Sequence, residues 1–119
     1  MLGYTVRTEK ITNSRQEVVV QFLRKRGSID LKLIEPSGPT SPLIEFVKKG
    51  GGLHHLCFHA EDGETSIQDL TSSGARLTTK PEPGEAFNDN LISFLYLGFG
   101  LSIEVIDTDE RRGEISGPD

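Results

Sequence analysis

The sequence predicts an α+β fold made of two related halves, each rich in β-strands. The main observation is an internal repeat, in which three segments of the first half resemble three of the second at an offset of 71 to 72 residues. The matched pairs are 3–6 with 74–77, 20–23 with 92–95, and 29–35 with 101–107. The last pair alternates apolar and polar residues in step, as strands with one buried face do. The interpretation that any two β-meanders look alike stays open.

The second half carries two further elements ahead of its three strands. An apolar strand is expected over residues 53–60, followed by a helix over residues 64–73. Asp62 is suited to be the N-cap of this helix, and Gly74 to end it. Residues 53–107 are therefore predicted to form a complete βαβββ module.

The first half is expected to lack the opening strand and helix, because projecting the pattern backwards places that strand before Met1. Residues 1–36 are therefore predicted to be a truncated first module of three strands, within one domain overall. An equally open interpretation is that Met1 is an internal start and the missing elements belong upstream. Residues 108–119, which are polar and contain Gly and Pro, are expected to form a flexible tail.

A linker over residues 37–52 is expected to hold a short helix. Ser41 would be its N-cap, and Pro42 would take the first helical position, where a missing N–H costs least. Its buried face would carry Leu43, Phe46 and Val47.

Composition excludes several classes of protein. A net charge of −5 argues against a nucleic-acid or anionic-membrane partner. The single cysteine, Cys57, excludes an intramolecular disulfide and fits a reducing cytoplasm. No apolar run is long enough for a transmembrane helix, and the first residues do not have the pattern of a signal peptide. A cytoplasmic protein is expected.

Two adjacent histidines, His54 and His55, follow three glycines at the start of the predicted strand 53–60. Side chains alternate along a strand, so the two rings are expected on opposite faces of the sheet. One histidine would then be structural, whereas the other would be available for chemistry.

The middle of the chain resembles a known family. The segments 34–36 (Ile-Glu-Pro), 41–42 (Ser-Pro) and 51–58 (Gly-Gly-Leu-His-His-Leu-Cys-Phe), together with the two modules, are similar to the vicinal oxygen chelate superfamily. That superfamily contains glyoxalases, bleomycin-resistance proteins, dioxygenases and methylmalonyl-CoA epimerases, and the similarity is greatest to the epimerases. The resemblance implies paired half-barrels around one divalent metal ion, such as Co, Ni, Zn or Mg, which stabilises an enolate.

The resemblance also implies particular site residues. His55 matches a first-strand metal ligand, and Glu104 matches a last-strand ligand that also acts as the catalytic acid or base. Cys57 and His59 would line the same cavity, while His54, Leu56 and Phe58 would face the helices.

The ligands of the first module are where the resemblance fails. Its first-strand histidine is absent, and Lys32 stands at the position that matches Glu104. An ammonium group cannot coordinate a cation. Asp30, on the same strand face, would line the cavity beside Lys32. One hypothesis is that the ammonium of Lys32 replaces the lost metal by pairing with Glu104; the alternative is that Lys32 extends into solvent from a strand end.

Three loops are also assigned from the sequence. Arg24-Lys25-Arg26 is expected at a solvated hairpin tip, with contact to a nucleotide phosphate of a CoA-type ligand as the alternative. Gly98-Phe99-Gly100 is expected to form a tight hairpin, and residues 81–90 a loop over the cavity mouth that acts as a lid.

Three functions remain open on this basis. The first is an enzyme that moves a proton α to a thioester or carbonyl, the second is a metal-free module that binds a small molecule, and the third is an inactive assembly protein. A homodimer is expected, because a truncated module leaves a sheet face and a strand edge uncovered. The identity of the substrate does not follow from the sequence.

Overall fold

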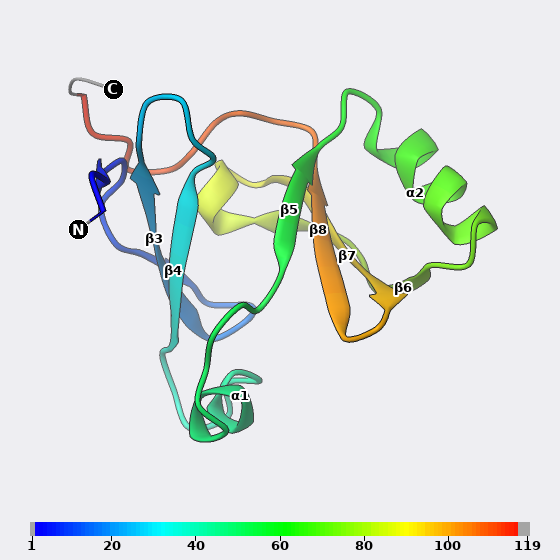
Figure 1. Ribbon diagram of the computed structural model, residues 1–119, viewed down its shortest axis with the longest axis horizontal. Coiled ribbons are helices and arrows are strands. Elements are labelled where there is room, and N and C mark those ends of the chain that lie inside the picture. Colours follow the sequence, from blue (N-terminus) through cyan, green and yellow to red (C-terminus); the bar gives the residue numbers. More distant parts are fainter. Residues whose placement is uncertain (1, 117–119) are drawn as a thin grey trace. The chain divides into compact units, whose positions relative to one another are not determined.

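The computed structural model describes residues 2–116 of the chain. These fall into two compact units, one made of Met1–Gly51 with Arg111–Asp119 and the other of Gly52–Glu110 (Figure 1).

The first unit is an antiparallel sheet with a single short helix. Its long strand β3 pairs along one edge with β1 and β2 and along the other with β4. The elements are β1 (Thr5–Val6), β2 (Ile11–Asn13), β3 (Val18–Arg24), β4 (Leu31–Pro36) and α1 (Ile44–Lys48). Alternate residues of β3 are buried, namely Val18, Val20 and Phe22, as the period-2 pattern predicts.

The helix between the halves begins later than predicted. It starts at Ile44 with Leu43 as its N-cap, because Ser41 and Pro42 form a turn in which the N–H of Ile44 bonds the carbonyl of Ser41. Leu43 is buried as expected, at 3% exposed, but Val47 is 49% exposed and does not belong to a buried face.

The second unit is a four-stranded mixed sheet with α2 packed on one face. Its strand order is β5-β8-β7-β6, in which β5 runs parallel to β8 and the other neighbours are antiparallel. The elements are β5 (Leu56–His59), α2 (Gly63–Ser72), β6 (Arg76–Gly84), the short 3₁₀ helix η1 (Glu85–Phe87), β7 (Asn90–Gly98) and β8 (Leu101–Ile106). Two sheets with few helices confirm the predicted α+β class.

The strand pair β3–β4 of the first unit has the same register as the strand pair β7–β8 of the second. In the first unit Phe22 lies opposite Lys32 and Leu23 opposite Leu31. In the second unit the residues 72 positions later pair in the same way, with Phe94 opposite Glu104 and Leu95 opposite Ile103. This agreement supports the predicted repeat, although the module boundaries drawn from the sequence stay a prediction.

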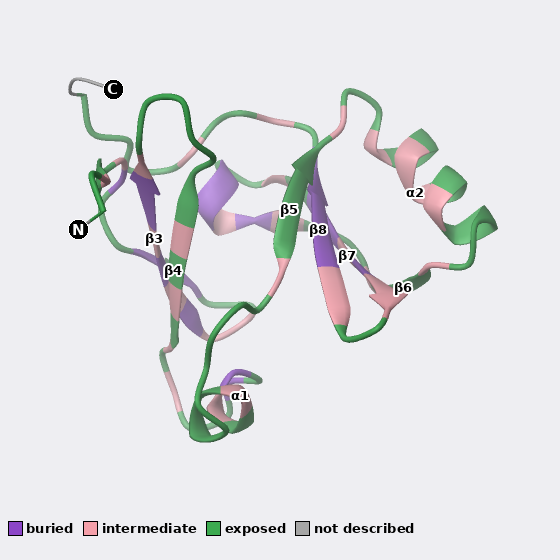
Figure 2. Ribbon diagram, viewed as in Figure 1, coloured by how far each residue is buried: buried purple, intermediate pink, exposed green. Residues whose placement is uncertain are grey.

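A comparison of the two halves shows that α2 buries one face of the second sheet. Leu95, Ile103 and Val105 are 0%, 3% and 4% exposed, because they pack with Ile67 and Leu70 of α2 and other apolar side chains. Their counterparts in the first unit are Leu23, Leu31 and Leu33, which are 9%, 36% and 50% exposed (Figure 2). Among the described residues, β4 pairs only with β3, so its second edge carries no strand.

The expected lid is largely a strand. Residues up to Gly84 belong to β6, and Ala86 and Phe87 of η1 are buried. The two prolines of this segment, Pro81 and Pro83, fit in β6 because its register with β7 shifts between Leu77 and Glu82, where the ladder is irregular.

Within the expected flexible tail, Gly113 and Ile115 bond to the backbone near β1, and the flexibility of the tail stays a prediction. Glu9 donates its N–H to the carbonyl of Gly113, and the N–H of Ile115 bonds the carbonyl of Arg7, at 3.0 and 2.8 Å. Residues 117–119 lie outside the part of the chain that the structure describes. No helix among the described residues is long and apolar enough to cross a membrane.

The hairpin between β7 and β8 has the tight turn that the sequence predicts. Phe99 and Gly100 form its tip, with φ of +56° and +75°, and the side chain of Phe99 is fully exposed. A bulky residue is strained at positive φ, whereas asparagine tolerates it.

Phe99→Asn is therefore expected to raise the free energy of unfolding by about 1 kcal/mol, measured by urea denaturation. Phe99→Val should lower it; equal stability of the two variants would contradict this explanation.

Helix α2 has the N-cap that the sequence predicts. Asp62 accepts the backbone N–H of Thr65 at 3.1 Å and the Thr65 hydroxyl at 2.8 Å. These two bonds hold the pKa of Asp62 below its usual value of 3.8, and the bond from the backbone N–H has the larger effect.

Because the folded pKa of Asp62 is lowered, its stabilising effect is present above about pH 3.8 and is lost as pH falls through the folded pKa. The difference in thermal midpoint between the wild type and Asp62→Ala is therefore expected to be largest at neutral pH and to shrink below pH 3.8. A midpoint series by circular dichroism, with Asp69→Ala as the control carboxylate, tests this. A difference that grows on acidification would be the wrong sign.

Candidate functional site

The candidate site begins with Glu104, a carboxylate inside the second unit. Glu104 lies in β8 between Ile103 and Val105, which point to the face that α2 covers. Side chains alternate along a strand, so Glu104 points to the other face. It is 1% exposed. A buried carboxylate is costly unless a polar or charged group pairs with it.

His55 provides such a group. Its Nε2 lies 3.4 Å from Oε1 of Glu104, and the two side chains are 5% and 2% exposed. The edge of the imidazole ring meets Phe94, with ring centroids 5.3 Å apart and planes at 84°. Phe94 is the residue of β7 directly opposite Glu104. The predicted pair therefore meets, enclosed on one side by an aromatic ring.

The expectation that His54 and His55 point to opposite faces is wrong. Strand β5 begins only at Leu56, so both histidines precede it and do not alternate. Their Nδ1 atoms lie 2.8 Å apart, with the rings edge to face. The three glycines at 50–52 all have positive φ, which keeps the chain irregular until Leu56. His54 thus extends the His55–Glu104 pair towards solvent.

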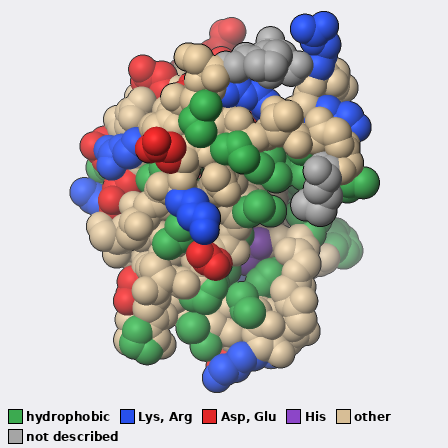
Figure 3. Space-filling model, turned by 90° about the vertical axis from the view of Figure 1, so that its left-hand side faces the viewer, with side chains coloured by type: hydrophobic (Ala, Val, Ile, Leu, Met, Phe, Trp, Pro, Cys, Tyr) green, Lys and Arg blue, Asp and Glu red, His purple; other side chains and the backbone are tan. Residues whose placement is uncertain are grey.

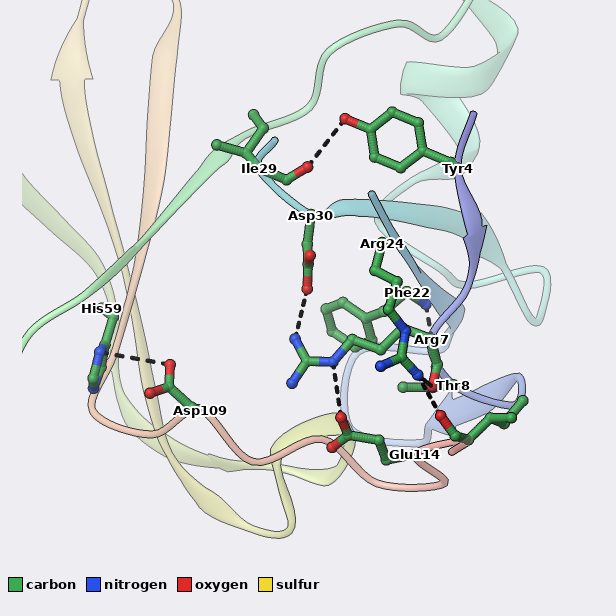
Figure 4. A network of polar contacts seen from close by, with 11 residues as sticks. Tyr4, Arg7, Thr8, Phe22, Arg24, Ile29, Asp30, His59, Asp109 and Glu114 are labelled. Carbon is green, nitrogen blue, oxygen red and sulfur yellow. Dashed lines mark hydrogen bonds and ion pairs between the residues drawn. The ribbon is translucent and has the colours of Figure 1, made fainter. Parts of the chain in front are cut away.

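The other residues predicted to line the cavity lie outside this pair. Cys57 is exposed, and it lies opposite Glu104 in the parallel register of β5 and β8. His59 is at the surface, where its Nδ1 lies 3.7 Å from Asp109 (Figure 4). Leu56 and Phe58, expected beneath helices, are 36% and 53% exposed.

Lys32 and Asp30 belong to the first unit. The ammonium of Lys32 lies 5.9 Å from the centre of the Phe22 ring, a cation–π contact. Asp30 precedes β4 and binds Arg7 at 2.5 Å (Figure 4). The proposed pairing of Lys32 with Glu104 stays a prediction.

Sequence reasoning missed two neighbours of the pair, Phe94 and His54. The repeat contains a signal for Phe94, because Phe22 and Phe94 occupy matching positions opposite Lys32 and Glu104. For His54 there was no signal, since its position depends on where the strand begins.

The donor set of the pair is half of what a metal site needs. An imidazole nitrogen and a carboxylate oxygen suit ions such as Zn²⁺, but protein sites supply three or four ligands. Among the described residues, no third His, Cys, Asp or Glu joins them in a group that could hold an ion. The residues present do not make a complete metal site, so the chemistry considered below is that of the two side chains.

Curated relatives match part of the chain. An ethylmalonyl-CoA/methylmalonyl-CoA epimerase of Cereibacter sphaeroides is 32% identical over 68 residues, which are 56% of this chain and 51% of the relative. An uncharacterised protein of Bacillus subtilis, YqjC, is 35% identical over 85 residues, 71% of this chain and 59% of the relative. The chain thus spans about half to three-fifths of the length of these relatives.

Solved structures have the same fold. A hypothetical protein from Bacillus halodurans is 25% identical, with a TM-score of 0.78, covering 95% of this chain and 82% of its own. A methylmalonyl-CoA epimerase from Mycobacterium tuberculosis is 25% identical, with a TM-score of 0.76 and coverage of 89% and 72%.

A family model matches residues 1–96, which include His55 but not Glu104. This match, the shared fold and the similarity to epimerases agree with the resemblance of the central segment. The chain belongs to the glyoxalase/bleomycin resistance protein/dioxygenase superfamily.

Proposed function

We propose that this protein is an epimerase-like isomerase, which removes and returns a proton on a carbon next to a thioester or carbonyl group. The observation that carries the proposal is the buried pair of His55 and Glu104, 3.4 Å apart. Similarity to methylmalonyl-CoA epimerases supports the choice of a thioester substrate.

The two groups together can carry out both proton transfers. The carboxylate of Glu104 accepts the proton as the C–H bond breaks and an enolate forms, and the pair, which shares that proton, returns it to the same carbon after the planar enolate has turned its other face to the pair. Because both side chains are almost fully buried, neither charge is weakened by water. A proton held between them also avoids leaving a single buried charge. The proposal includes a cavity that lets the substrate reach His55.

The experiment follows the exchange of the α-proton of methylmalonyl-CoA in deuterated buffer by NMR. Wild-type protein is expected to exchange it, and Glu104→Gln and His55→Asn should each slow the exchange at least about 100-fold. His59→Asn is the matched control, because His59 is an exposed histidine of the same unit. The proposal fails if the wild type gives no exchange above buffer, or if the three variants behave alike.

The role of a metal ion is tested in the same assay. Exchange that survives treatment with EDTA is expected if the two side chains suffice. Loss of exchange on EDTA that cobalt restores would keep the isomerase function but assign the chemistry to a bound ion.

A second candidate function is metal-free binding of a small molecule. It is favoured by the incomplete donor set and by Lys32, a cation at the position that matches Glu104. Here methylmalonyl-CoA would raise the thermal midpoint of wild type without any exchange of its proton, and EDTA would have no effect.

Self-association is expected with either function. Ile29, Leu31 and Leu33 are 73%, 36% and 50% exposed at and beside the unpaired edge of β4. Exposed apolar strand edges are normally covered. We propose that the protein acts in the cytoplasm. At micromolar concentration, light scattering after size exclusion is expected to give the mass of a dimer. The mass of a monomer would contradict the expectation.

A further inference from the structure

The two units differ strongly in charge. The first contains 11 Lys and Arg against 7 Asp and Glu, a net charge of +4, whereas the second contains 2 against 11, a net charge of −9. The overall charge of −5 therefore hides a basic unit. Figure 3, which views the molecule from the left-hand side of Figure 1, shows Lys and Arg side chains at the surface together with Asp and Glu side chains.

Half of this excess of positive charge surrounds one cleft of about 400 Å³ within the first unit. Its lining includes four cations, Arg7, Arg24, Lys25 and Arg26, and two carboxylates, Asp30 and Glu114. The cleft thus carries a formal excess of two positive charges. Its volume lies in the range of small-molecule sites rather than that of a single inorganic ion.

The two carboxylates both form salt bridges with Arg7. Its guanidinium binds Asp30 at 2.5 Å and Glu114 at 3.3 Å (Figure 4). Burial alone would lower the pKa of Arg7, but these two hydrogen-bonded carboxylates together outweigh it and raise the pKa. Arg7 and its two partners together carry a formal charge of −1, so the positive excess of the cleft lies on the consecutive residues Arg24–Arg26.

Two of these three cations, Arg24 and Lys25, are held in place by backbone carbonyl groups. Nη2 of Arg24 donates to the carbonyls of Arg7 and Ile115, and Nζ of Lys25 donates to the carbonyl of Leu2 at 2.9 Å. Carbonyl groups orient a cation without cancelling its charge. An ammonium has three N–H donors, and its bond to the carbonyl of Leu2 uses one of those of Lys25.

The turn that carries the cations is also fixed. The hydroxyl of Tyr4 lies 2.7 Å from Oγ of Ser28 and donates to the carbonyl of Ile29 at 3.0 Å. Lys25 packs over the ring of the same tyrosine, with Nζ 5.7 Å from its centre. A turn held in this way places the three like charges together before a ligand arrives, which lowers the entropy lost on binding.

We propose that this cleft is a binding site for the phosphate groups of a nucleotide-sized organic anion, with Arg24, Lys25 and Arg26 as its main contacts. Consecutive Arg and Lys side chains at a cleft match phosphate oxygens through charge-assisted hydrogen bonds. The site lies wholly within the first unit and does not depend on the proton chemistry of His55 and Glu104.

Isothermal titration of the full chain with ADP at low salt tests the proposal. Binding is expected to weaken at least about tenfold in Lys25→Gln/Arg26→Gln and to weaken as salt is raised. Lys48→Gln/Lys49→Gln is the matched control, because it removes the same charge from exposed residues of the same unit and should change the affinity less than about twofold. Pyrophosphate should displace ADP, and adenosine should not.

Three results would overturn the site. They are equal binding of ADP by the two double variants, equal binding of ADP and adenosine by the wild type, and no binding of ADP at low salt. Arg26→Gln alone, with the circular dichroism spectrum of the wild type, repeats the test if the double variant is poorly folded.

Discussion

Replacing Leu95 by alanine is expected to lower the free energy of unfolding by about 3–5 kcal/mol. Leu95 is fully buried, and it packs with Ile103 and Val105 beneath helix α2. Removing one methine and two methyl groups there loses their transfer free energy and leaves a cavity that the close-packed sheet and helix fill only in part. Urea denaturation monitored by circular dichroism gives the value.

The repeat supplies a control with the same chemistry. Leu33 matches Val105 of that core, but it is 50% exposed because no helix covers it among the described residues. Leu33→Ala is expected to cost less than about 1 kcal/mol. Similar losses in the two variants would mean that the first sheet is covered in solution, for example by a second copy of the chain.

Much of the fold could be predicted from the sequence because its signals are local. Strand alternation depends on residues two apart, and a helix N-cap on residues three apart, so β8 and the cap at Asp62 are local signals. The repeat then related distant segments, because Phe22 and Phe94 occupy matching positions. The prolines of β6 and the start of α1 were misplaced because irregular ladders and turns tolerate sequences that are typical of loops.

The candidate site was predictable only in part, for a related reason. Glu104 and His55 were both assigned from the resemblance to the family, and alternation in β8 explains why Glu104 points away from the face that α2 covers. The position of His54 was wrong because the face of a side chain changes with every residue of a strand, so an error in the strand's start reverses or removes the assignment. The network of Arg7, Asp30 and Glu114 joins residues up to 107 apart in the sequence, and no local pattern reports such a contact.

A double-mutant cycle on His55 and Glu104 is expected to give the second large effect, a coupling free energy of about 1–3 kcal/mol. The two side chains are within 5% of full burial and 3.4 Å apart, so each compensates for the desolvation of the other. His55→Gln and Glu104→Gln keep the size and polarity of each group and remove its ability to carry charge. Each single variant leaves a buried charge or donor without its partner, whereas the double variant leaves an amide pair.

The cycle shows whether His55 and Glu104 interact energetically or only lie close together. If the groups interact, the double variant loses less stability than the two single variants together, measured by urea denaturation at pH 7. The surface pair of His59 and Asp109 is the control, since its atoms are 3.7 Å apart and Asp109 is 86% exposed. Its coupling is expected to be below about 0.5 kcal/mol because water screens exposed charges. Additive losses at His55 and Glu104 would remove the electrostatic basis on which the proposed proton transfer depends.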